Sequence, residues 1–160
     1  GNASEKGVAA SHQVDEIALI DMGDFVGGML KYLRTHPVSR VTIAGGVAKM
    51  TKLAQGMLDV HSKRGPPDLE ALAGIALDSG APQSLAERIV LANTVAEAFD
   101  IADEANIRIG DSAASGAWHT AAKALNSPDI SLEILVFDRN GGLRGRAPFK
   151  PSSHSGASPA

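Results

Sequence analysis

The chain is 160 residues long and 44% hydrophobic, which suits one ordinary domain with a sizeable core. Fifteen basic residues stand against 18 acidic ones, and the net charge of −3 argues against a nucleic-acid-binding domain, for which a basic patch and a high pI are typical. The chain has no cysteine, so the sequence excludes disulfides and thiolate metal sites. No apolar run approaches the roughly 20 residues of a membrane span, and we expect a cytoplasmic protein without a membrane partner.

The first half of the chain alternates strand-like apolar runs with segments of helical spacing. Residues 41–44 are β-branched or apolar, as in a buried strand. Apolar residues from Phe25 onward recur at helical spacing until Pro37, before which a helix normally ends. The sequence therefore predicts, in order, a strand at 17–20, a helix at 25–36, a strand at 41–44 and a helix at 47–57.

The second half begins with helices and ends with strands. A helix from residue 69 should close at Gly80, the usual left-handed residue after a helix. The longest apolar stripe, residues 82–99, predicts one helix that crosses the core. A further helix, capped by Asp111, carries Trp118. The chain then predicts a buried strand at 132–137, a hairpin turn at Asn140-Gly141 and an edge strand at 143–147.

This order of elements predicts an α/β fold, with a largely parallel sheet flanked by helices and a C-terminal β-hairpin. We expect residues 1–149 to form the α/β domain. Residues 150–160 are small, polar and rich in Pro and Ser, so they are predicted to be a disordered tail without a core to join.

Three segments place Gly, Asn, Ser or Asp where a strand hands over to a helix. In an open α/β sheet such turns lie at the carboxyl ends of the strands, where ligands usually bind. Glycine lets the backbone approach a ligand closely, and a helix N-terminus offers free N–H groups. The candidates for ligand contact are Asn2 and Ser4 in the first segment, Asp21, Gly23 and Asp24 in the second, and Gly45 and Gly46 in the third.

Each of these candidates also has a structural interpretation. Gly45-Gly46 can hold a ligand carboxylate or phosphate, or can simply let a helix fold tightly back on the sheet. Asp21 and Asp24 can hydrogen-bond a ribose or an amine, or can cap a helix. The glycine spacing matches neither a P-loop nor the G-x-G-x-x-G dinucleotide motif.

Residues 58–65 hold the densest polar cluster. His61, Lys63 and Arg64 suit a solvated helix end, where basic residues complement the helix dipole. They also suit a loop that grips an anionic substrate and moves a proton through His61. Spacing alone favours the solvated end. The other histidines form no pair with metal-ligand spacing, so we expect no protein metal site.

Six segments, taken in order, resemble one family. They are GNASE, ALIDMGDFVGGMLKYLR, TIAGGVAKMTKLAQG, LDVHS, ANTVAEA and FDRNGGLRGRA. Together they are similar to the second half of the cobalt-precorrin-5B C(1)-methyltransferases, the CbiD family of anaerobic cobalamin biosynthesis. The resemblance runs from Gly1 to about Phe149, and the family's chains are roughly twice as long.

The resemblance implies transfer of a methyl group from S-adenosylmethionine to C-1 of a cobalt-precorrin, from cobalt-precorrin-5B to cobalt-precorrin-6A. This chemistry fits the candidate residues above, and the cofactor is then expected to meet Asp21, Gly23, Asp24, Gly45 and Gly46. The substrate would meet Asn2, Ser4, Lys63 and Arg64, and His61 is the candidate base. The expected partners are the corrinoid and the family's N-terminal half, and the chain can also form a homo-oligomer.

Two alternatives stay open from the sequence. The chain can be a ligand-binding or assembly module without activity in the absence of the N-terminal half. It can also be an unrelated α/β domain that binds a nucleotide or phosphate through the same glycine segments.

Overall fold

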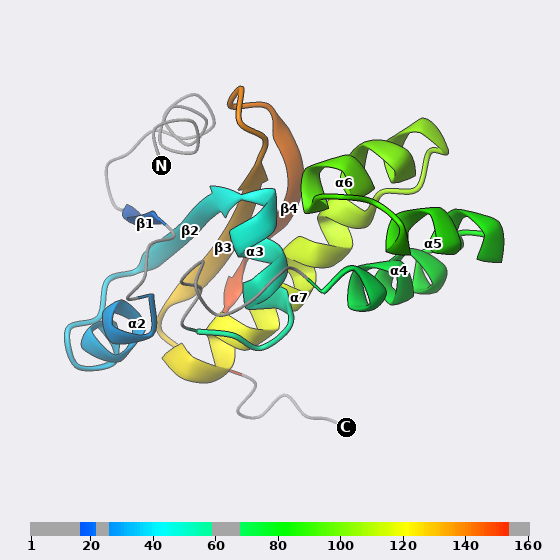
Figure 1. Ribbon diagram of the computed structural model, residues 1–160. Coiled ribbons are helices and arrows are strands. Elements are labelled where there is room, and N and C mark those ends of the chain that lie inside the picture. The colour runs from blue at the N-terminus through cyan, green and yellow to red at the C-terminus, as the bar shows by residue number, and fades with distance from the viewer. Residues whose placement is uncertain (1–16, 22–25, 59–67, 154–160) are drawn as a thin grey trace.

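A computed structural model describes residues 17–21, 26–58 and 68–153 (Figure 1). In these ranges the strands predicted at 41–44 and 132–137 lie inside longer strands, as expected from their apolar runs. The described elements are β1 (Ile17–Asp21), α2 (Val26–Thr35), β2 (Arg40–Gly46), α3 (Val47–Ala54), α4 (Leu69–Asp78), α5 (Gln83–Val90), α6 (Val95–Glu104), α7 (Ile109–Leu125), β3 (Ser131–Phe137) and β4 (Leu143–Pro151).

The described strands form one four-stranded sheet in the order β1-β2-β3-β4. β1 pairs with β2 in parallel, and β2 pairs with β3 in parallel. β4 pairs with β3 in the antiparallel direction, which makes the C-terminal hairpin that the sequence predicts at Asn140-Gly141. The α/β class and the C-terminal hairpin are therefore as predicted, and the described sheet is mixed, with two parallel pairings and one antiparallel pairing.

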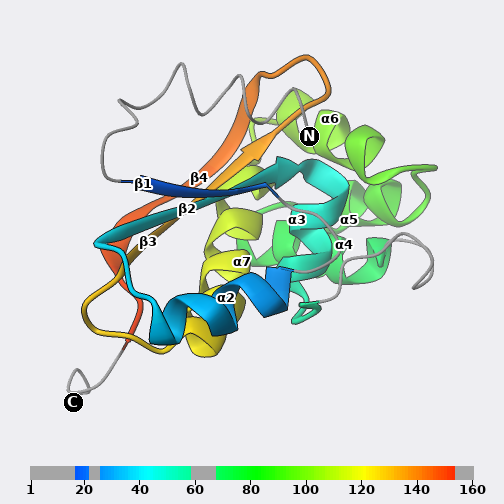
Figure 2. The same cartoon turned by 90° about the vertical axis from the view of Figure 1, so that its left-hand side faces the viewer.

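The described helices that flank the sheet lie on one of its faces (Figure 2). α7 packs against β3 and β4, and α3 packs against α7. Trp118 of α7 is fully buried, and its indole Nε1 donates a hydrogen bond of 2.8 Å to the backbone oxygen of Leu132. This bond satisfies the polar end of the largest core side chain and fixes α7 on the sheet.

A close backbone approach joins α7 to β4. A Cβ added at Gly110 would lie 1.8 Å from the backbone oxygen of Arg144, and one added at Gly145 would lie 2.1 Å from the backbone oxygen of Gly110. Neither distance is possible for real atoms, so glycine is required on both sides of this contact.

The face of the sheet opposite the described helices carries a buried charge. The side chain of Glu133 is inaccessible to solvent, and the Arg146 guanidinium lies 2.7 Å from its Oε2. The Thr42 hydroxyl donates to Glu133 Oε1 at 3.0 Å. Both carboxylate oxygens are thus hydrogen-bonded, which is the condition under which a buried charge is tolerated. Ala44, Leu135 and Phe137 form a small apolar cluster of their own.

The single helix predicted at 82–99 is wrong, because the structure has two helices, α5 and α6, with a break between them. Thr94 begins α6, and its hydroxyl accepts a hydrogen bond of 3.0 Å from the backbone N–H of Glu97. The Glu97 carboxylate accepts in return from the backbone N–H of Asn93 at 3.0 Å. This reciprocal capping starts a new helix in a different direction.

Two further details differ from the sequence predictions. α7 begins at Ile109, so Asp111 lies in its first turn rather than at its cap, and its carboxylate accepts from the backbone N–H of Arg146 at 3.0 Å. The ordered fold also passes the predicted boundary at residue 149, because β4 continues to Pro151 and the Ser152 N–H donates to the Ile130 backbone oxygen at 2.9 Å.

Gly80 is left-handed, with φ of 100°, and follows α4 as predicted. Among the described residues, no helix is long and apolar enough to cross a membrane.

Candidate functional site

The carboxyl ends of β1, β2 and β3 meet at one edge of the sheet, here called the carboxyl edge. The pairing register sets Asp21 beside Ala44 and sets Gly46 beside Phe137. The strand ends that precede the predicted ligand segments are therefore neighbours. In parallel strands this edge is the usual place for a ligand.

Gly45 and Gly46 form the last two residues of β2 rather than a turn. Gly46 has φ of −74° and ψ of 165°, an extended backbone that any residue adopts. A Cβ at Gly46 would lie 3.9 Å from the Phe137 backbone oxygen, an ordinary contact distance. Neither conformation nor packing in the described residues requires glycine at 46, so the tight-turn interpretation of this position is not supported.

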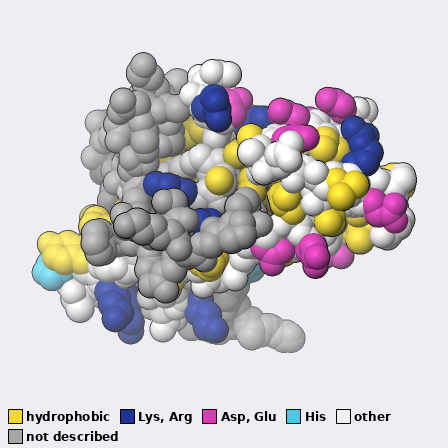
Figure 3. Space-filling view, viewed as in Figure 1, with side chains coloured by type: hydrophobic (Ala, Val, Ile, Leu, Met, Phe, Trp, Pro, Cys, Tyr) yellow, Lys and Arg dark blue, Asp and Glu magenta, His cyan; other side chains and the backbone are white. Residues whose placement is uncertain are grey.

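α3 starts directly at the carboxyl edge. Gly46 is its N-cap residue and has no side chain that could accept from the first-turn N–H groups. The first turn has no acidic residue, while Lys49 and Lys52 follow. Figure 3 shows Lys or Arg side chains over α3. This end of the helix is therefore electropositive and suited to an anionic group.

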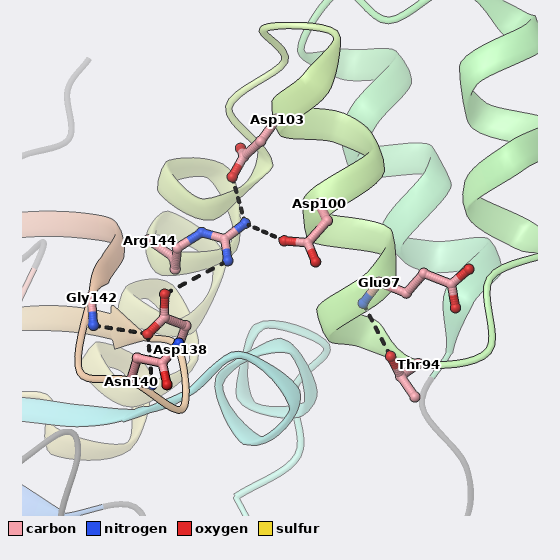
Figure 4. Close-up of polar contacts among 8 residues, drawn as sticks. All are labelled: Thr94, Glu97, Asp100, Asp103, Asp138, Asn140, Gly142 and Arg144. Atoms are coloured by element: carbon pink, nitrogen blue, oxygen red, sulfur yellow. Dashed lines mark hydrogen bonds and ion pairs between the residues drawn. The ribbon is translucent and has the colours of Figure 1, made fainter.

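A second polar group at the same edge centres on Arg144, at the start of β4. Figure 4 shows its guanidinium between Asp138, which follows β3, and two carboxylates of α6. Arg144 Nη2 lies 3.3 Å from Asp100 Oδ1 and also hydrogen-bonds Asp103, while Nη1 lies 4.0 Å from Asp138. The Arg144 side chain is 17% exposed, so this cluster is half withdrawn from water.

The electrostatics of Arg144 reflect opposing causes. Burial lowers its pKa, but the hydrogen bond and charge of Asp103, together with those of Asp100, outweigh burial and raise the pKa above its ordinary value. The guanidinium thus stays charged. Asp138 Oδ1 in turn accepts from the backbone N–H groups of Asn140 at 2.9 Å and Gly142 at 2.8 Å. The cluster holds the hairpin loop against α6 and shapes this side of the edge.

This cluster was not predicted from the sequence. The available signal was Asp138, which directly follows a predicted buried strand and precedes Asn140-Gly141. Arg144 and its partner Asp100 are 44 residues apart in the chain, and no local pattern indicates that they meet.

Most of the predicted site residues lie outside the described residues. These are Asn2, Ser4, Gly23, Asp24, His61, Lys63 and Arg64. Of the others, Asp21 ends β1, and Gly45 and Gly46 end β2. Their ligand roles stay predictions.

One contact relates the ends of two segments that contain these residues. A Cβ at Gly27, the second residue of α2, would lie 3.5 Å from Leu58 Cβ. Leu58 directly precedes the segment with His61, Lys63 and Arg64, and Gly27 closely follows the segment with Gly23 and Asp24. The described flanks of both segments are therefore close in space. Within the described ranges no group of His, Asp and Glu could hold a metal ion.

Comparison with known proteins gives a consistent result. The family model for the CbiD C-terminal domain matches residues 59–148. A protein of Agrobacterium fabrum named cobalt-precorrin-5B C(1)-methyltransferase is 62% identical over 95% of this chain and 40% of its own length. Proteins of the same name from Halorhodospira halophila and a Bradyrhizobium species are 57% and 51% identical, over 92% and 91% of this chain and 39% of their own lengths. No solved structure matches.

The chain thus spans about 40% of the length of the curated relatives that it matches. The family resemblance suggested by the six ordered segments is confirmed by the family model and by these identities. The chain belongs to the CbiD family and contains its C-terminal domain.

Proposed function

We propose that this chain contributes the C-terminal part of a methyltransferase that transfers a methyl group from S-adenosylmethionine to C-1 of cobalt-precorrin-5B, giving cobalt-precorrin-6A. The observation that carries the proposal is the 62% identity over 95% of the chain to a protein named for this reaction. At this level of identity, relatives commonly share the chemistry of their sites, and family membership disfavours an unrelated nucleotide binder.

The carboxyl edge has features that fit the methyl donor. The donor's amino-acid portion ends in a carboxylate, which suits the uncapped, electropositive N-terminus of α3. Gly46 is exposed, which allows close approach of a ligand to the backbone. Asp21, at the neighbouring strand end, and Asp24 are the acidic residues proposed for the ribose hydroxyls. Gly23 and Gly45 complete the proposed contact.

When bound, the donor supplies a sulfonium methyl group, whose transfer is an in-line displacement: a carbon–carbon bond forms at C-1 as the carbon–sulfur bond breaks. Such a step depends above all on positioning. The chain's contribution is then to fix the donor at a rigid sheet edge and to present the ring's C-1 in line with the methyl group. His61 is the proposed acceptor for a proton that the ring releases.

The substrate is a polycarboxylate, because its ring carries acetate and propionate arms. Lys63 and Arg64 are the residues proposed to bind these arms, since ammonium and guanidinium groups form charge-assisted hydrogen bonds with carboxylates. Asn2 and Ser4 are proposed as further polar contacts.

A second candidate function follows from the coverage of 40% of each relative. The chain can bind a ligand and yet require the remainder of the family's chain for turnover. This differs from the first proposal only in what the chain does alone.

A chimeric enzyme tests the proposal. The matching portion of the Agrobacterium fabrum relative is replaced by this chain, and methyl transfer to cobalt-precorrin-5B is followed by mass spectrometry with isotopically labelled S-adenosylmethionine. The proposal expects one labelled methyl group in the product, at a rate within about tenfold of the parent enzyme. A folded chimera that leaves cobalt-precorrin-5B unmethylated, beside an active parent, rejects it. The 160-residue chain assayed alone separates the two candidates.

A further inference from the structure

Lys52 of α3 is an unusual lysine because almost all of it is withdrawn from solvent. Its exposed fraction is 7%, whereas lysine is rarely buried unless it is paired. Among the described residues, no hydrogen bond or ion pair of its side chain is found, while every fully buried side-chain nitrogen and oxygen there has a partner. The carbon stem of Lys52 is therefore packed, and its ammonium group reaches the surface without a partner in the part of the chain that the structure describes.

The position of Lys52 on α3 directs that ammonium group toward the carboxyl edge. Long side chains on a helix lie back over the preceding turn, toward the helix N-terminus. For Lys52 that turn consists of Ala48 and Lys49, both of which are exposed. Gly46, at the helix start, is exposed too. The unpaired charge and the N-terminal N–H groups of α3 thus face the same region.

The distribution of charge over the helices agrees with an anionic ligand on this side. α2 and α3 carry basic residues and no acidic ones. α4, α5 and α6 carry seven acidic residues and one arginine, and acidic side chains are prominent over these helices in Figure 3. An anion is therefore attracted to α3 and repelled from the far helices.

We propose that Lys52, together with the N-terminal turn of α3, forms a binding site for a ligand carboxylate. The inference rests on the proposed function for the identity of the ligand. Two sources supply the same chemistry there, the amino-acid carboxylate of S-adenosylmethionine and a carboxylate arm of the corrinoid. A cation whose stem is already packed loses little conformational freedom on binding, so its charge-assisted bond is an effective anchor.

Binding measurements on the chimeric enzyme test this site with two matched pairs of probes. S-adenosylhomocysteine carries the carboxylate that 5′-methylthioadenosine lacks. Cobyrinic acid carries free carboxylate arms, and cobinamide carries amides in their place. The proposal expects the wild-type protein to prefer the carboxylated member of at least one pair. Lys52→Met should lower that affinity by about tenfold or more and leave the affinity for the member without the carboxylate unchanged. The pair affected identifies the source of the carboxylate.

Two variants serve as controls. Lys52→Arg keeps the charge and should retain affinity within about threefold. Lys123→Met removes an exposed lysine from the last turn of α7 and should leave both pairs unchanged. Melting temperatures supply an independent readout: because methionine keeps the packed stem and the substitution removes no ion pair seen among the described residues, the melting temperature of Lys52→Met without ligand should be equal or higher.

Each other result overturns the proposal. The proposal fails if the wild-type protein prefers the carboxylated probe in neither pair. It also fails if Lys52→Met keeps the full preference for the carboxylated probe. A variant that melts earlier and loses both members of a pair equally shows that Lys52 supports the fold instead. Because the readout is binding, the two proposals can fail separately. A chimera that is inactive but keeps the preference for the carboxylated probe rejects the methyltransferase proposal alone. An active chimera whose binding is unchanged by Lys52→Met rejects the Lys52 site alone.

Discussion

Arg144 shows at the residue scale how the fold shapes the carboxyl edge. It joins the start of β4 to α6 through Asp100 and Asp103 and approaches Asp138 in the hairpin loop. Its guanidinium also lies 5.7 Å from the centre of the Phe99 ring, which is buried in the core. The side chain thus links a loop, a helix and the core in one contact, and each of its charged partners remains partly in water.

Arg144→Met should lower the free energy of unfolding by about 1–2 kcal/mol, because charge-assisted hydrogen bonds are lost while the exposed carboxylates stay hydrated. Urea unfolding of the 160-residue chain measures the change. Arg139→Met, which removes an exposed arginine of the same hairpin loop, is the matched control and should change stability by less than about 0.5 kcal/mol. Equal effects of the two variants would show that the Arg144 cluster contributes nothing specific.

At the scale of elements, the packing of α7 on β4 is set by two glycines. Gly110 and Gly145 let the two backbones approach more closely than any Cβ would permit. Gly145 lies between Arg144 and Arg146, so this contact also fixes where both arginines leave the strand. The position of the charged cluster therefore depends on glycines that touch no ligand.

Gly145→Ala should destabilise the chain by about 2–4 kcal/mol, because the added methyl group would overlap the backbone of α7 and force the elements apart. Gly74→Ala is the control. Gly74 lies inside α4 with nothing within 4 Å of a Cβ, so alanine there should stabilise the helix by up to about 1 kcal/mol. Urea unfolding should therefore show a lower free energy of unfolding for Gly145→Ala and an equal or higher one for Gly74→Ala. A Gly145→Ala variant as stable as the wild type would contradict the close contact.

Elements with a strong local signal could be predicted from the sequence, and those set by long-range contacts could not. Residues 132–137 are apolar on both faces, so β3 was evident. The break between α5 and α6 also had a local signal, the Thr94 to Glu97 capping spacing, but the continuous apolar stripe across it favoured one helix. The one-sided helix layer had no such signal. On the sheet face opposite the described helices, Glu133 is buried beside Arg146 and Thr42, which lie 13 and 91 residues away in the chain. No local pattern predicts that contact.

At the scale of the whole molecule, the mixed sheet and its single described helix layer leave the carboxyl edge as the meeting point of several features. Parallel strands end there, α3 begins there, and the Arg144 cluster borders it. The sequence predicted this edge from glycine and aspartate spacing. It left open whether Gly45-Gly46 contacts a ligand or allows a tight turn, and the structure has an extended strand end in which Gly46 is exposed.

Calorimetric titration of S-adenosylhomocysteine into the chimeric enzyme measures whether the carboxyl edge binds the methyl donor. Gly46→Ala should weaken binding more than tenfold, about 1.4 kcal/mol, because a methyl group obstructs close approach of the ligand. Its melting temperature should change little, since the backbone at Gly46 suits alanine and the nearest described atom to a Cβ there is 3.9 Å away.

Gly28→Ala, in α2 with open space around its Cβ, should bind as the wild type does. Weakened binding by Gly46→Ala alone, at an unchanged melting temperature, is the predicted result. Wild-type affinity in Gly46→Ala, or no binding of S-adenosylhomocysteine by the unmodified chimera, would contradict the claim.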